Sequence, residues 1–152
     1  MLRARMPVAL MAVLLACVAS AQQASEQNDA DKARAMLLRA SVAVKADKEA
    51  ALKKFTAGED GFRDRDIYPY CFALNDGVVV TGQTRGNDIR TLKDPTGKAF
   101  GQEIFNAAQK SEGEITEIRY LAPRPGPDRT PVAKVSFVTR VGGLGCGVGY
   151  YP

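Results

Sequence analysis

The stretch "DRDIYPYCFALNDGVVVTG", residues 64–82, decides the fold. It predicts two strands joined by a tight turn at "NDG", because Gly77 is free to take a positive φ. In the first strand Tyr68, Tyr70 and Phe72 fall on alternate positions, so their rings share one face of a sheet. The hairpin leaves one question open, which is whether this aromatic face covers a core or lines a cavity.

A glycine-rich stretch, "GLGCGVGYY" at residues 143–151, predicts the last strand of the sheet. It is not a phosphate-binding loop, because its glycines do not have the G-x-G-x-x-G spacing. They alternate, so they form one bare face that a large side chain or a ligand can approach closely. If the first and last strands are neighbours, a bridge between Cys71 and Cys146 would set the aromatic rings over these glycines on the other face. From the residues alone the two cysteines are either a disulfide or two buried thiols.

Helical patterns precede and follow the hairpin. Residues 28–44 carry one apolar stripe, Met36, Leu37, Ala40 and Val44. A second helix, "KEAALKKF", is capped by Asp47 and ended by Gly58, and a third is expected over residues 98–109. Further strands are expected over residues 115–121 and 131–141. The order predicts an α+β domain with an antiparallel sheet and with its helices gathered on one side.

The N-terminus has the layout of a secretory signal peptide over residues 1–21. Arg3 and Arg5 precede an apolar run, and "ASA" predicts cleavage after Ala21. We therefore expect a periplasmic or secreted domain over residues 28–152, after a flexible leader at 22–27. The alternative is a lipoprotein anchored through Cys17, because "LLAC" resembles a lipobox.

Histidine is absent from the 152 residues. Its absence removes the commonest general base, the commonest metal ligand and every Ser-His or Cys-His arrangement. We therefore expect neither an enzyme with catalytic residues nor a metal or cofactor site.

The net charge gives little reason to expect a nucleic-acid partner. The chain has 21 Lys and Arg against 17 Asp and Glu, a formal charge of +4. Loss of residues 1–21 would leave 19 against 17, or +2, with no dense basic patch interleaved with aromatic residues.

Four segments, taken in order, resemble the single Cache family of extracytoplasmic sensor domains, in its second single-domain type. They are "FRDRDIYPYCFALNDG", "TLKDPTGKAFGQEIFNAAQ", "EIRYLAPRPGPDRTPVAKVSFV" and "GCGVGYY". With the first helix they cover about residues 31–151. The resemblance implies a PAS-like fold, in which a long N-terminal helix packs on a five-stranded antiparallel sheet whose first and last strands are neighbours.

The resemblance also implies a pocket that binds a small metabolite, often a carboxylate. Its ligand-binding residues would be Tyr68, Tyr70, Tyr120, Lys134 and Ser136. From the residues alone, the tyrosines could equally be core and Lys134 could equally face solvent. Arg119 is expected to pair with Glu117 at the surface, and Arg124 and Arg129 are expected to be solvated.

Two functions follow from these patterns. The first is a sensor that binds an organic acid, amino acid or amine and acts with a membrane histidine kinase or chemoreceptor. The second is an exported structural or interaction protein, or a lipoprotein, with a filled core and no ligand. The first helix is also a candidate surface for a homodimer.

Overall fold

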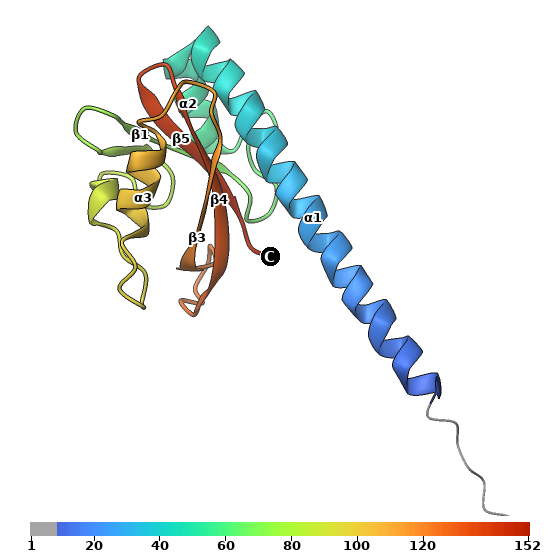
Figure 1. The fold of residues 1–152 in the computed structure, drawn as a ribbon. Helices are drawn as coiled ribbons and strands as arrows, with labels where there is room; N and C mark the ends of the chain where they lie inside the picture. The colour runs from blue at the N-terminus through green and yellow to red at the C-terminus, as the bar shows by residue number, and fades with distance from the viewer. Residues whose placement is uncertain (1–8) are drawn as a thin grey trace, which may run out of the picture.

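The structure is a computed structural model that describes the backbone of residues 9–152, with side chains at residue 25 and from residue 27 onward. It begins with a long helix, α1 (Ala9–Ala46), followed by α2 (Lys48–Ala57). The first half of α1 extends past the sheet, and its second half lies against it (Figure 1). The expected signal peptide and Cys17 lie where no side chains are described.

Helix α1 begins earlier than the apolar stripe predicts and includes residues 22–27, the expected flexible leader. The Ala, Gln and Glu residues of this segment have good helix propensity, so nothing in it stops the helix. Asp47 caps α2 as predicted, accepting a 3.0 Å hydrogen bond from the amide of Ala50, and Gly58 ends it with φ of 72°. Among the residues that the structure describes, no helix is long and apolar enough to cross a membrane.

Five strands form one antiparallel sheet in the order β2-β1-β5-β4-β3. The strands are β1 (Pro69–Ala73), β2 (Val79–Thr81), β3 (Thr116–Pro123), β4 (Pro131–Val141) and β5 (Leu144–Tyr150). The first and last strands are therefore neighbours, as the resemblance implied. Strand β1 begins after a turn in which Asp64 and Ile67 exchange two backbone hydrogen bonds, of 3.0 and 2.9 Å.

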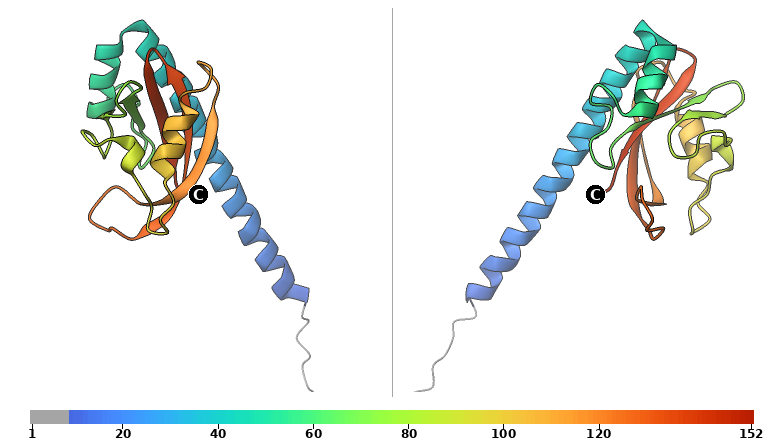
Figure 2. Two further views of the ribbon diagram at one scale, coloured as in Figure 1. Left: turned by 60° about the vertical axis from the view of Figure 1, so that its left-hand side comes forward. Right: turned by 180° about the vertical axis from the view of Figure 1, so that it is seen from behind.

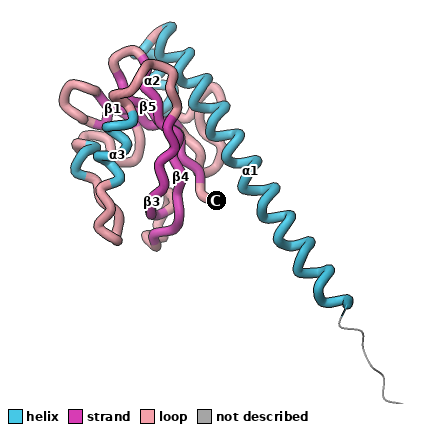
Figure 3. The backbone as a smooth tube through the Cα atoms, in the orientation of Figure 1, coloured by secondary structure: helices cyan, strands magenta, loops and turns pink. Residues whose placement is uncertain are grey.

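The helices cover both faces of the sheet, so the expectation that they gather on one side is wrong. Helices α1 and α2 pack on one face, and a 3-10 helix, η1 (Ile89–Thr91), packs with α3 (Phe100–Ala107) on the other (Figure 2). The cause is the central strand β5, whose seven residues are all buried, so that neither face can be left to water. The segment between β2 and α3 is loop apart from η1 (Figure 3).

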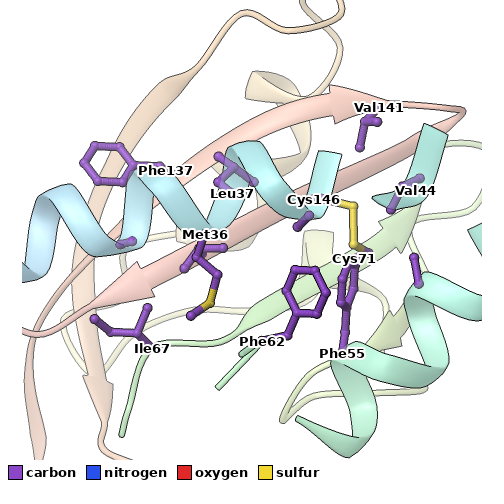
Figure 4. Packing of buried hydrophobic residues seen from close by; sticks show 14 of the residues in the cluster. Met36, Leu37, Val44, Phe55, Phe62, Ile67, Cys71, Phe137, Val141 and Cys146 are labelled. Carbon is purple, nitrogen blue, oxygen red and sulfur yellow. A yellow bond between two sulfur atoms is a disulfide. The ribbon is translucent and has the colours of Figure 1, made fainter. Parts of the chain in front are cut away.

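The core beneath α1 contains the predicted apolar stripe, all of which is buried. Cys71 and Cys146 form a disulfide within it, between directly paired residues of β1 and β5 (Figure 4). Phe55 of α2 meets Phe62 edge to face, with ring centroids 4.6 Å apart. Side chains fill this core, and a polar cavity of about 520 Å³ remains at its edge, between α1 and strands β3, β4 and β5. A larger space, with more apolar walls, lies on the opposite face.

Candidate ligand-binding site

A cavity of about 630 Å³ lies on the sheet face opposite α1. That volume is within the range of small-molecule sites. Its walls come from the start of β1, from β3 and β4, from the segment between β2 and α3, and from α3 itself. The lining residues are Tyr68, Tyr70, Gln83, Thr84, Ile89, Leu92, Lys93, Asp94, Pro95, Phe100, Ile104, Tyr120, Leu121, Ala122, Pro123, Arg129 and Lys134.

The aromatic face of the first strand covers a core at one end and lines the cavity at the other. The ring of Phe72 occupies the space where Gly145 would carry a Cβ, and the ring of Tyr70 does so at Gly147. Phe72 is fully buried beside α3, whereas Tyr70 and Tyr68 line the cavity. The predicted covering of glycine by large rings is therefore present at Phe72 and Tyr70.

Lys134 is the one fully enclosed cation of the cavity among the described residues. Its residue is only 7% exposed, so it does not face solvent. Its Nζ lies 5.5 Å from the ring centroid of Tyr68 and 4.9 Å from that of Tyr151. Among the described residues, no carboxylate oxygen lies within 4 Å of Nζ, and Nζ donates no hydrogen bond.

Burial lowers the pKa of Lys134 to about 8, and the charge of Asp66 only partly offsets this. The ammonium is therefore still largely protonated at neutral pH, although the site disfavours its charge. An anion placed beside Nζ would compensate that cost.

Hydroxyl groups gather beside this cation. The hydroxyls of Tyr120 and Ser136 are hydrogen-bonded at 2.9 Å, and Ser136 lies behind the cavity wall rather than in it. The hydroxyl of Tyr70 is buried and has no hydrogen-bond partner among the described residues. Burial raises the pKa of Tyr70 and of Tyr120, so both hydroxyls stay protonated and can donate to a ligand.

Asp94 fixes the loop that forms one wall, and the sequence analysis did not single it out. Its carboxylate accepts hydrogen bonds from the amides of Thr96 (2.9 Å), Lys98 (3.1 Å) and Leu121 (3.2 Å), and from the Thr96 hydroxyl (2.5 Å). These bonds, the Thr96 hydroxyl first, lower the pKa of Asp94. The bond to Leu121 ties the loop to β3. The detectable signal was "DPTGK", because Asp followed by Pro and Gly is typical of such side-chain-capped turns.

Aromatic residues outside the first strand also contact the site residues. Phe100 of α3 stacks on Tyr120 with ring centroids 4.1 Å apart and planes 3° apart. The ring of Tyr151 contacts two cations, with its centroid 4.9 Å from Nζ of Lys134 and 4.5 Å from Cζ of Arg124. Nothing in the sequence marks Phe100 or Tyr151 as site residues, because a ring on a helix and a ring after the last strand both look like core residues.

The three arginines lie at the surface as expected, and two of them make further contacts. Arg119 pairs with Glu117 at 2.7 Å on the surface, as predicted. Arg124, expected to be solvated, is half-exposed and pairs with Asp66 at 2.8 Å. Arg129 is exposed as expected, but it also lines the cavity.

Comparison with solved structures identifies the fold. A methyl-accepting chemotaxis protein from Vibrio parahaemolyticus matches with a TM-score of 0.65 at 18% identity, over 88% of this chain and 95% of that one. A periplasmic sensor domain of a chemotaxis protein matches with a TM-score of 0.61 at 25% identity, over 87% and 96%. A Cache chemosensory domain, described for carboxylic acid recognition, matches with a TM-score of 0.62 at 22% identity, over 87% and 96%. No protein-family model and no curated protein matches the chain.

These similarities show that the chain has the fold of the PAS-like α+β domains with a long leading helix. Within that class the fold is that of a single Cache domain, as the four sequence segments indicated. Two of the three similar structures are described as sensor or chemosensory domains, and the third as a chemotaxis protein.

Proposed function

We propose that this protein is an extracytoplasmic sensor domain that binds a small organic acid in the cavity. The observation that carries the proposal is Lys134, a buried cation with no anionic partner among the described residues. A buried charge is ordinarily paired, because leaving it unpaired costs free energy. A ligand carboxylate would supply the missing partner.

The neighbouring groups favour an acid over an amine. Tyr70 and Tyr120 would donate hydrogen bonds to a carboxylate near Lys134. The apolar walls, including Phe100 and Ile104, would hold the carbon skeleton. The alternative of a filled core predicted no cavity, so the cavity of about 630 Å³ speaks against it.

Location and partner are part of the proposal. The similar structures include a periplasmic sensor domain, and a buried disulfide suits an oxidising compartment. The ligand-bound state would be passed to a membrane chemoreceptor or histidine kinase, with a homodimer through α1 as the arrangement to test. Leu38 and Val42, exposed on α1, would lie at that contact.

A thermal-shift screen against small carboxylates, amino acids and amines tests the proposal. We expect carboxylates to raise the melting temperature and amines to leave it unchanged. Lys134→Met keeps the side-chain volume while removing the charge, and should abolish the shift. Lys110→Met is the matched control, because Lys110 is a surface residue that pairs with Glu114 outside the cavity. An unaltered shift in Lys134→Met would contradict the proposal.

A further inference from the structure

The cavity carries more positive charge than one carboxylate can neutralise. Lys93, Arg129 and Lys134 line it against a single lining carboxylate, Asp94, which gives a formal charge of +2. Asp94 is not available to the cations, because its oxygens already accept the hydrogen bonds that hold its loop. The electrostatic complement of the cavity is therefore a dianion.

Two of these cations lie at different depths of one cavity. Lys134 is buried and lies opposite Tyr120 in the pairing of β3 with β4. This pairing ends three residues away, where Pro131 of β4 lies opposite Pro123 of β3. That end is roughly 10 Å along the strand from Lys134. Arg129 lies beyond that end, in the exposed loop that connects β3 to β4, so its charge is at the solvent side of the cavity.

Arg129 has no competing partner in the part of the chain that the structure describes. It forms no ion pair and no hydrogen bond there, whereas the nearby Arg124 is committed to Asp66. A free guanidinium presents a planar fork that binds a carboxylate through two hydrogen bonds.

Part of the cavity wall is apolar. It includes the stacked rings of Phe100 and Tyr120 and the side chain of Leu92. An aliphatic chain fits such a surface, and the volume exceeds what the smallest carboxylates need.

We infer that the ligand is an α,ω-dicarboxylate, with one carboxylate beside Lys134 and the other on Arg129 at the solvent side. Lys93 adds to the attraction of the second charge. This inference rests on the proposed function, since it assumes that Lys134 binds the first carboxylate.

Isothermal titration calorimetry of the purified protein tests the second contact. The probes are succinate, glutarate and adipate, each compared with the monocarboxylate of equal length: butyrate, valerate and hexanoate. We expect at least one diacid to bind about threefold to tenfold more tightly than its monoacid, the gain of a two-bond Arg–carboxylate pair at a partly exposed site. Arg129→Gln should remove that gain and leave the monoacid unchanged. Arg119→Gln, outside the cavity, should alter neither.

The outcomes separate the inference from the proposed function. Binding of monoacids that depends on Lys134, with no gain for any diacid, would overturn the inference alone. An equal loss for both kinds of acid in Arg129→Gln would also overturn it, because the arginine would then contact the first carboxylate or support the loop. No binding of any probe, or binding that survives Lys134→Met, would overturn the inference and the proposed function together.

Discussion

The ring of Tyr70 lies over Gly147 of the neighbouring strand, in the space that a Cβ at that position would occupy. The same strand pair carries the disulfide of Cys71 and Cys146 on its other face. One pair of strands therefore builds a cavity wall and anchors the core beneath α1.

Replacing Gly147 by Ala should destabilise the domain by about 1–3 kcal/mol, because the new methyl group overpacks against the Tyr70 ring. Urea unfolding followed by circular dichroism measures the change. In the double variant Gly147→Ala/Tyr70→Ala the two substitutions should be less costly together than their separate effects predict. Strict additivity would show that the ring and the glycine do not depend on each other.

Removing the disulfide should lower the free energy of unfolding by about 2–5 kcal/mol, since the bridge closes a long loop. The two cysteines are 75 residues apart in the sequence. The measurement is chemical unfolding of Cys71→Ala/Cys146→Ala beside the oxidised wild-type protein. A reducing agent should destabilise the wild type and leave the variant unchanged. Equal stability of the variant and the oxidised wild type would contradict the assignment of the bridge.

Lys134 should make the ligand-free protein more stable as pH rises from 8 to 10. Its pKa is lowered to about 8 from an ordinary 10.5, so in this range the unfolded chain binds more protons than the folded one. Stability rises with pH under that condition, here by about 2 kcal/mol. Above pH 10 the buried tyrosines, with raised pKa values, act in the opposite direction.

The control for this prediction is Lys134→Met. The rise between pH 8 and 10 should be smaller in the variant by that same amount, because other titrating groups remain. Affinity for a carboxylate should fall over the same range in the wild type, since a neutral amine no longer attracts it. Parallel stability curves for the two proteins would show that Lys134 is not buried as described.

Asp94→Ala should release the cavity loop from β3. The amide of Leu121 loses its hydrogen-bond acceptor, so its hydrogen exchange should become faster, and carboxylate affinity should fall with it. Asp47→Ala is the matched control, because Asp47 accepts a bond from the amide of Ala50 at the start of α2, outside the cavity. Unchanged hydrogen exchange of the Leu121 amide in Asp94→Ala would show that Asp94 does not anchor the loop to β3.

Much of the fold could be predicted from local pattern. The alternation of Tyr70 with Cys71 and of Gly147 with Cys146 was enough to pair the first and last strands once the Cache resemblance supplied their order. The placement of α3 on the other face could not be predicted, because its apolar stripe shows that it packs but not on which side of the sheet.

The candidate site was predictable in its strands and not in its loops. Tyr70, Tyr120 and Lys134 lie in strands as predicted, Tyr68 directly precedes β1, and all four line one cavity. Arg129 and Asp94 lie in loops whose path depends on tertiary contacts, so their side chains could not be placed from spacing. Whether Lys134 faced water or the interior depended on Tyr151, which lies 17 positions later in the sequence.

The central claim is that Lys134 binds a ligand carboxylate, and its side-chain pKa tests it most directly. The measurement is an NMR pH titration of the Lys134 Cε signal, with and without the carboxylate that most raises the melting temperature. The account predicts a pKa near 8 in the free protein and an upward movement with ligand, because the anion stabilises the ammonium. A pKa that is the same in both samples would contradict it.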